Sequence, residues 1–247
     1  GADFRLGALI LAGLAMPAFL ATSWGTRERV APPATARLHL GRTIAEMFTL
    51  VLRSSALRRL MATILMVGLA VTLLNKSLLF LFDQVGAADI GYYVALSPSL
   101  SLLLTAPLWS RLAERIGQAR TLRLGAVLLF LAILLAFVSQ GLASMLVCIT
   151  LSIIAVQGMS VMFWSLVPGA VAACEQEAHA AGYAVRVYAV ATITRKLAQA
   201  LAPQLIAIAL FAPHGSILMI LAAVAFLTVL VVTFFPPVEE RAITAGP

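Results

Sequence analysis

The sequence predicts an all-α membrane protein, and its composition and apolar pattern carry that prediction. Of the 247 residues, 62% are hydrophobic and only 11% are charged, whereas a soluble domain has about 25% charged residues. Uncharged apolar runs of about 18 or more residues recur, which is the length that a transmembrane helix needs. These runs lack the apolar–polar alternation of a membrane β-barrel, so we expect helices rather than strands.

Seven apolar segments follow one another along the chain. Each is near the roughly 20 residues that cross the hydrocarbon layer as a helix. The segments cover residues 5–24, 60–82, 90–109, 121–140, 143–167, 183–212 and 215–235. They predict a first transmembrane helix in 1–24, a connection in 25–59, a six-helix transmembrane bundle in 60–236 and a tail in 237–247.

Basic residues concentrate in alternate connections between these segments. Those on one side include Arg27, Arg29, Arg37, Arg42, Arg53, Arg58, Arg59, Arg111, Arg115, Arg120, Arg123, Arg186 and Arg241. The other connections, around 83–89, 140–141 and 213–214, contain no Lys or Arg. By the positive-inside rule the basic side and the C-terminus are cytoplasmic. We therefore expect a multi-pass protein of the plasma (inner) membrane.

The long connection in 25–59 begins with the turn-prone stretch APPATA. After it, Leu40, Ile44, Met47 and Leu50 fall at helical spacing among arginines. This pattern predicts an amphipathic helix on the cytoplasmic membrane surface, with its arginines near anionic headgroups. A solvated linker helix accounts for the pattern equally well.

Other classes of protein are disfavoured. The net charge of +7 does not indicate nucleic-acid binding, because the cations lie in connections and form no basic-aromatic surface. Cys148 and Cys174 lack metal-site spacing, and the histidines are scattered. There is no nucleotide-binding loop or nucleophile–base pair, so we expect no catalytic residue, no metal site and no enzyme.

Because an apolar segment follows Gly1–Ala2–Asp3–Phe4 without a signal-peptide pattern, we expect a piece of a longer protein.

Three motifs resemble a known family of carriers. They are GTRERV at 25–30, LWSRLAERIGQARTLRLG at 108–125, and FWSLVPGAVAACEQEA at 163–178 followed by RKLAQAL at 195–201. Their order resembles the later half of the glycoside–pentoside–hexuronide:cation symporters, the melibiose-carrier group of the major facilitator superfamily. The resemblance implies a C-terminal six-helix bundle plus the preceding helix. It also implies a partner N-terminal six-helix half, in which the ligands of the coupling ion, Na⁺ or H⁺, are expected.

The motif at 108–125 is similar to the superfamily pattern Gly-x-x-x-Asp-Arg-x-Gly-Arg, where Arg115 and Gly117 match. Ser110, Glu114 and Gln118 replace the first Gly, the Asp and the last Arg. In the later motif the family's acids are replaced by Gly169, Ala172 and Cys174, while Glu175 remains. The resemblance implies a cytoplasmic gate formed by Arg111, Glu114, Arg115, Gly117, Arg120 and Glu175. Its ion pairs would break and reform during transport, although simple positive-inside anchoring also explains these arginines.

Lys196 is the main candidate for the substrate and coupling cavity. It lies roughly 20 Å along its predicted helix, near the middle of the bilayer, where a charge costs at least about 2.5–3.5 kcal/mol. The acids of the chain lie in loops, tails or span ends. Its counter-charge would therefore come from the absent half or an anionic ligand, unless the lysine is deprotonated or snorkels outward.

Polar residues near Lys196 extend this candidate cavity. Thr192, Lys196, Gln199 and Pro203 share one helix face, which is typical of a substrate pathway but also of interhelical hydrogen bonding. Arg195 is turned by about 100° from Lys196, and is expected at the cavity edge or packed on backbone carbonyls of a neighbouring helix.

Two further helices supply candidates. Asn75 and Lys76 lie toward the outer end of the second span, where Lys76 lines the cavity or snorkels outward. Gln157 and Trp164 share a face of the fifth span. An amide and an indole suit a sugar, although Trp is also common at membrane interfaces.

These features predict one half of a secondary transporter that moves a sugar or similar small polar solute across the bilayer by cation-coupled symport. Two alternatives remain open. One is a non-transporting or degenerate half-carrier that acts as a membrane sensor or partner subunit. The other is a transporter of an amphiphile or organic anion drawn to Lys196.

Overall fold

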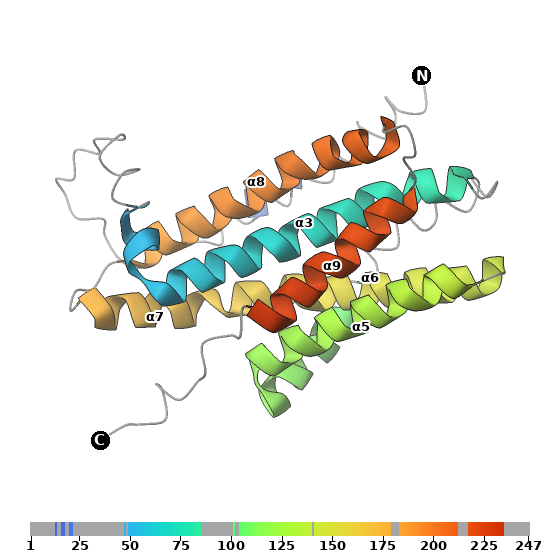
Figure 1. Cartoon of the computed structure of the whole chain (residues 1–247). Coiled ribbons are helices and arrows are strands. Elements are labelled where there is room, and N and C mark those ends of the chain that lie inside the picture. Colours follow the sequence, from blue (N-terminus) through green and yellow to red (C-terminus); the bar gives the residue numbers. More distant parts are fainter. Residues whose placement is uncertain are drawn as a thin grey trace. The chain divides into compact units, whose positions relative to one another are not determined.

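The computed structural model describes residues 13, 16–17, 20–21, 47, 49–84, 101, 104–139, 141–178, 183–211 and 217–234. The chain divides into two compact units, Gly1–Gly41 and Arg42–Pro247. The helices with defined bounds lie in the second unit (Figure 1). They are α3 (Ser55–Gln84), α5 (Gln118–Val138), α6 (Leu142–Ser165), α7 (Val167–Ala178), α8 (Ala184–Phe211) and α9 (Ile217–Phe234).

Every described residue of the predicted spans in 5–24 and 90–109 is helical, and so are residues 47 and 49–53 of the predicted amphipathic helix. The remainder of these segments and the predicted tail in 237–247 lie outside the described residues. The all-α fold class predicted from the sequence is confirmed.

Within the described part of the chain, three stretches are both long and apolar enough to cross a membrane. They are Ser55–Leu78, Gln118–Val138 and Leu142–Gln176. In α9, residues Ile220–Val231 form a shorter apolar helix. The 28-residue helix α8 is long enough but is not among the three, and its middle carries Arg195, Lys196 and Gln199.

The connection before α5 is a single glycine. Residues 104–116 are helical, and Gly117 then adopts φ 90° and ψ 148°, a conformation that side chains with a Cβ rarely enter. Its N–H donates to the carbonyl of Ala113 at 2.9 Å, and its own carbonyl accepts the N–H of Thr121 at 3.0 Å. The predicted loop motif is therefore almost entirely helical.

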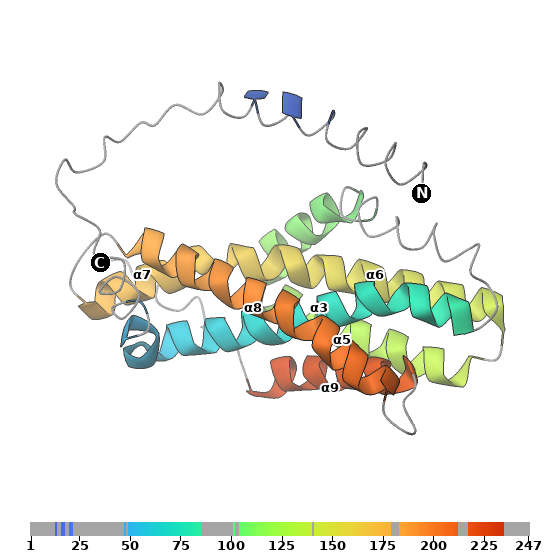
Figure 2. The ribbon, with the colours of Figure 1, turned by 90° about the horizontal axis from the view of Figure 1, so that it is seen from above.

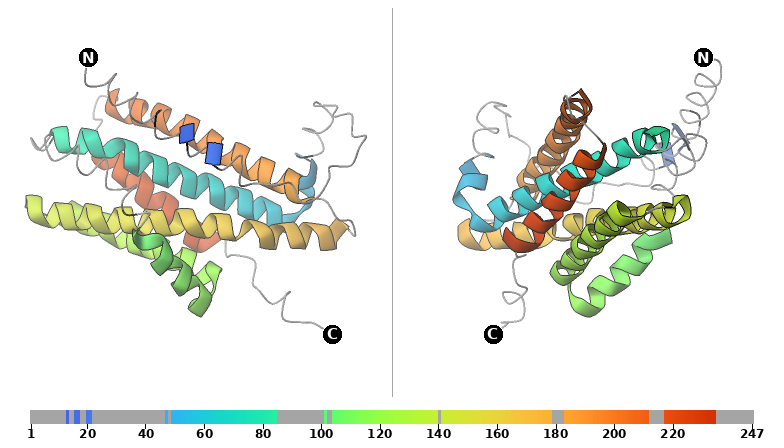
Figure 3. Two further views of the ribbon diagram at one scale, coloured as in Figure 1. Left: turned by 180° about the vertical axis from the view of Figure 1, so that it is seen from behind. Right: turned by 45° about the vertical axis from the view of Figure 1, so that its right-hand side comes forward.

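Helices α6 and α7 form a nearly continuous rod, in which Leu166 keeps an α-helical conformation between them (Figure 3). The N–H of Ala170 donates to the Leu166 carbonyl at 3.2 Å, so the helical hydrogen bonding resumes directly. Pro168 lies in the first turn of α7, where its missing N–H costs little. The predicted span at 143–167 therefore extends further, into α7.

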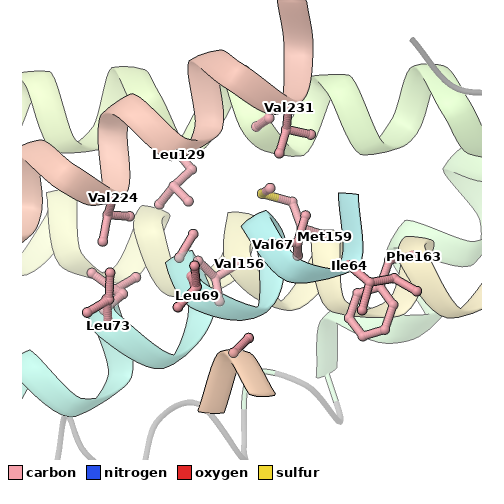
Figure 4. Close-up of a cluster of buried hydrophobic side chains, with 14 of the residues drawn as sticks. Ile64, Val67, Leu69, Leu73, Leu129, Val156, Met159, Phe163, Val224 and Val231 are labelled. Carbon is pink, nitrogen blue, oxygen red and sulfur yellow. The ribbon is translucent and has the colours of Figure 1, made fainter. Parts of the chain in front are cut away.

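Helix α3 is the centre of the second unit and packs against α6, α7, α8 and α9. Helix α5 packs against α6 and α9, which also contact α3 (Figure 2). Apolar side chains from α3, α5, α6 and α9, among them Leu73, Leu129, Val156 and Val224, converge in the shared core (Figure 4). Phe163, near the end of α6, lies at the edge of this group beside Ile64.

Small residues bring the helices close together. A Cβ added to Gly68 of α3 would lie 3.0 Å from the Cβ of Ala198 in α8. A Cβ added to Gly125 of α5 would lie 2.9 Å from Cγ of Met159 in α6. Such contacts are typical of helices in membranes, where close backbone packing replaces the hydrophobic effect as the main source of association.

Buried hydroxyl groups are satisfied within their own helices. Ser77 donates to the Leu74 carbonyl at 3.0 Å, and Ser152 donates to the Cys148 carbonyl at 2.9 Å. The buried Thr63, Thr121 and Thr228 bond to carbonyls three or four residues earlier in the same way. The helix interfaces therefore depend mainly on shape and apolar packing.

Candidate functional site

The polar face of α8 is not covered by the helices that the structure describes. Thr192 and Lys196 are exposed and Gln199 is half-buried, whereas Ala191 and Ala198 on the opposite side are fully buried. That opposite side includes the close approach to α3 at Gly68, so α8 has one face in the bundle and one face open.

Lys196 is the thirteenth residue of α8, so it lies roughly 18 Å along a helix of about 42 Å. The hydroxyl of Thr192, one turn earlier, donates to the Tyr188 carbonyl of its own helix at 2.9 Å. Pro203, two turns later, is exposed, and α8 remains helical through it. Among the described residues, no carboxylate lies within ion-pairing distance of Lys196.

Arg195 is half-buried and reaches from α8 to the aromatic residues near the end of α6. Its guanidinium carbon lies 5.5 Å from the ring centroid of Phe163 and 5.6 Å from that of Trp164. The two rings are 5.0 Å apart and tilted by 40°. Both distances are within the range of a cation–π interaction. We expected Arg195 either at the cavity edge or packed on backbone carbonyls of a neighbouring helix. In the structure it packs against a neighbouring helix through aromatic rings.

This contact depends on the length of the arginine side chain. In the described part of the chain, no Cα of α6 comes within 8 Å of a Cα of α8, while α3 packs against both helices. The side chain of Arg195 thus bridges two helices whose backbones do not touch. We call Arg195, Phe163 and Trp164 the cation–aromatic cluster.

The cluster joins two residues for which the sequence predicted separate roles. Trp164 is half-buried, and its ring is in contact with the Arg195 guanidinium. Gln157 is about two turns away on the same helix and is only 8% exposed. Phe163 is a member that sequence reasoning missed; the adjacent aromatic pair in its motif is the signal that could have identified it.

The candidates on α3 are separate from the cluster. Lys76 is exposed and Asn75 is half-buried. The side-chain oxygen of Asn75 is buried and has no hydrogen-bond partner among the described residues. Asn75 is two turns beyond Gly68, the point at which α3 contacts α8. The structure does not join Asn75 or Lys76 to Arg195 by any hydrogen bond within its described residues.

The predicted gate residues occupy two places. Arg111, Glu114 and Arg115 are exposed on the helix 104–116, and Arg120 is exposed in the first turn of α5. In the described part of the chain, the Glu114 carboxylate makes no ion pair with any of these arginines.

Two predicted gate residues remain. Gly117 lies between the helix 104–116 and α5, whereas Glu175 lies in α7 and connects it to the start of α8. Its Oε1 accepts the backbone N–H of Tyr183 at 3.2 Å. The Arg186 guanidinium lies 5.9 Å from the Tyr183 ring centroid. Glu175 therefore helps to hold in place the start of α8, the helix that carries Arg195 and Lys196.

A second contact between distant helices, at Trp109, was not predicted from the sequence. The buried indole of Trp109 donates its Nε1–H to the Ile154 carbonyl of α6 at 3.1 Å. The indole also fills the space beside Gly158, where any Cβ would overlap the ring. The helix 104–116 is thereby attached to the same helix that carries Phe163 and Trp164.

The comparisons with known proteins identify one similarity. Residues 2–215 match the protein family described as MFS/sugar transport protein. Searches of curated proteins and of solved structures found no match. The match covers the cation–aromatic cluster, the polar face of α8 and all the predicted gate residues.

Proposed function

Because the chain belongs to the MFS/sugar transport protein family, we propose that it supplies one helical bundle of a secondary active transporter for a sugar or similar small polar solute. The protein is an integral membrane protein with several helical passes, and its family is one of transporters rather than enzymes. Transport proceeds by alternating access and is coupled to Na⁺ or H⁺.

The exposed position of Lys196 near the middle of α8 is the observation that carries this proposal. A charge near the bilayer centre costs at least about 2.5–3.5 kcal/mol unless it faces water or an opposite charge. Lys196 lies on the face of α8 that the described helices leave open. A solute pathway along this face supplies the water and the polar partners that the lysine needs.

The same face supports a second bundle as the partner of this one. Thr192, Lys196 and Gln199 form a polar stripe that suits a protein-lined pathway better than contact with lipid tails. We assign the facing surface to an N-terminal six-helix half of the transporter, which carries the ligands of the coupling ion. The gate residues and the C-terminus lie on the cytoplasmic side of the plasma (inner) membrane, as the distribution of arginines indicates.

Uptake into vesicles tests this proposal. Proteoliposomes with the full-length protein are expected to accumulate a radiolabelled sugar when a Na⁺ or H⁺ gradient is imposed. Lys196→Ala is expected to lower the uptake rate by at least about tenfold, the effect of losing one charge-assisted hydrogen bond. Arg53→Gln, which removes an exposed cation outside this face, serves as the matched control.

Two results would contradict the proposal. If the uptake of every sugar tested did not depend on the Na⁺ or H⁺ gradient, cation-coupled symport would be excluded. Unchanged uptake by Lys196→Ala, with normal uptake by the control, would remove Lys196 from the pathway.

A further inference from the structure

We propose that Arg195 binds an oxyanion group of the transported solute, and that Phe163 and Trp164 hold its guanidinium in place for this purpose. The inference rests on the proposed transport function and names the chemistry of the solute. In this proposal Arg195 binds the anionic group of the solute, and Lys196 lies on a different face of the same helix.

The two aromatic rings fix the guanidinium without using its hydrogen-bonding capacity. They lie 5.5 Å and 5.6 Å from the guanidinium carbon, close enough for both rings to attract the cation. Phe163 is only 1% exposed, so one of the two rings is itself held firmly in the core. A ring attracts the cation through its π electrons and accepts no conventional N–H···O hydrogen bond. The N–H groups of Arg195 therefore remain available.

No oxygen acceptor for these N–H groups is found in the described part of the chain. Arg195 has neither a carboxylate nor a carbonyl within hydrogen-bonding distance there, and its two recorded interactions are the aromatic ones. A guanidinium carries five N–H donors and stays protonated in proteins. Because Arg195 is half-buried, these donors are partly withdrawn from water, and an oxygen acceptor on a bound solute could pair with them.

The charge around Arg195 favours an anion over a neutral acceptor. Helix α8 contains no acidic residue along its length, while Lys196 adds a second positive charge next to Arg195. Charges in a partly buried site interact more strongly than charges in water because the effective dielectric constant is lower. The two cations therefore attract an oxyanion to this level of the bundle.

The shape of the guanidinium favours a carboxylate, phosphate or sulfate group. Its planar fork matches two oxygens of such a group and forms paired charge-assisted hydrogen bonds. Lys196 projects about 100° away around α8, so it meets a different part of the solute or a group on the facing bundle. A solute with an oxyanion at one end and hydroxyl groups elsewhere fits both positions.

Chemical modification of Arg195 tests the site without requiring transport. The purified full-length protein is treated with the arginine reagent phenylglyoxal, and mass spectrometry measures the rate at Arg195. Acetate, phosphate, sulfate and galacturonate are the probes, with galactose and sodium chloride at equal ionic strength as controls. We expect at least one oxyanion to slow modification of Arg195 severalfold, while the rate at the exposed Arg53 stays unchanged. Equal rates with all probes, or no modification of Arg195 in the solute-free protein, would overturn the proposal.

A comparison of uptake then links the site to transport. Galactose and galacturonate differ at C6, where the acid has a carboxylate in place of a hydroxymethyl group. Arg195→Gln is expected to weaken the apparent affinity for galacturonate by about tenfold to a hundredfold, as loss of a bidentate ionic pair predicts, and to weaken that for galactose much less. Arg195→Lys keeps the charge but loses the planar fork, so it should restore affinity only in part. Equal losses for both sugars would show a structural role and overturn the proposal.

These two assays separate failure of the inference from failure of the proposed function. Galactose uptake without oxyanion protection would leave the transport function standing and remove the anion site. Oxyanion protection at Arg195 without gradient-driven uptake of any sugar would support the anion site and contradict cation-coupled transport.

Discussion

Arg195 and Lys196 are neighbours in the chain with different surroundings. Consecutive residues of an α-helix are rotated by about 100°, so Arg195 lies against Phe163 and Trp164 while Lys196 remains on the open face. The delocalised guanidinium suits aromatic packing because it is more weakly hydrated than an ammonium group. The compact charge of lysine is more strongly hydrated, so it suits the face that we assign to the solute pathway.

The contact at Gly158 depends on the absence of a single side-chain atom. The Trp109 indole lies where a Cβ of residue 158 would be, and its Nε1–H donates to the Ile154 carbonyl one turn earlier. A fully packed interface of this kind cannot accept another carbon without moving the helix 104–116 or the indole.

We therefore predict that Gly158→Ala destabilises the protein by about 1–3 kcal/mol, the usual cost of overpacking. Thermal unfolding of the purified full-length protein in detergent measures this as a lower melting temperature. Gly169→Ala is the matched control, because Gly169 is exposed in α7 and its added Cβ would meet no atom within 4 Å. The control should unfold at the original temperature or slightly higher, since alanine favours helix. Equal melting temperatures for the two variants would contradict the overlap at Trp109.

At the scale of the helix, α8 combines a narrow packing face with an open polar face. Ala191, Ala198 and Ala202 are fully buried, and their small side chains allow α8 to lie close to α3. The close approach at Ala198 is only two residues from Lys196. The packing of α8 on α3 therefore determines where both cations lie.

This arrangement predicts different effects for two alanines of α8. Ala198→Leu should force α8 away from α3, destabilise the protein by about 1–3 kcal/mol and lower solute uptake. Ala200→Leu adds the same atoms on an exposed position and should change the melting temperature little. The two variants are compared by thermal unfolding and by uptake into proteoliposomes. If Ala200→Leu proved as destabilising as Ala198→Leu, the assigned packing face of α8 would be wrong.

The helices were predictable from the sequence because their signals are local. Apolar runs and charge-free stretches identify α3, α5 and α6, and the cations within α8 identify it as the functional candidate. The helical nature of 108–125 was less accessible, since its arginines are typical of a connection. In the structure only Gly117 interrupts the helices there, because its φ of 90° ends one helix and begins the next.

The partners of the candidate site residues were not predictable, because they depend on tertiary position. Arg195 and Trp164 are separated by α7 in the sequence, and no local pattern relates them. Trp109 and Ile154 likewise belong to different helices, so their hydrogen bond follows from packing alone. Even the acid Glu175, which resemblance assigned to a gate, accepts a hydrogen bond at the start of α8 that only the fold reveals.

The distribution of charge and the length of the helices together predict the orientation of the protein in the membrane. Helix α5 has 21 residues and is about 31 Å long, close to the roughly 30 Å thickness of the hydrocarbon layer. Arg120 lies in its first turn, whereas Ser139 and Gly141 follow its end. The two ends of α5 should therefore lie on opposite sides of the membrane, with the arginine-bearing end inside.

Cysteine labelling in cells can measure this orientation. Cys148 and Cys174 are free and buried, and both are first replaced by alanine. Glu114→Cys then places a thiol at an exposed position before α5, and Leu142→Cys places one at an exposed position after it. A membrane-impermeant maleimide should label Leu142→Cys in intact cells, and Glu114→Cys only after the membrane is permeabilised. Labelling of Glu114→Cys from outside, with Leu142→Cys protected, would reverse the orientation. The predicted gate residues and the basic connection would then lie on the outer side of the membrane.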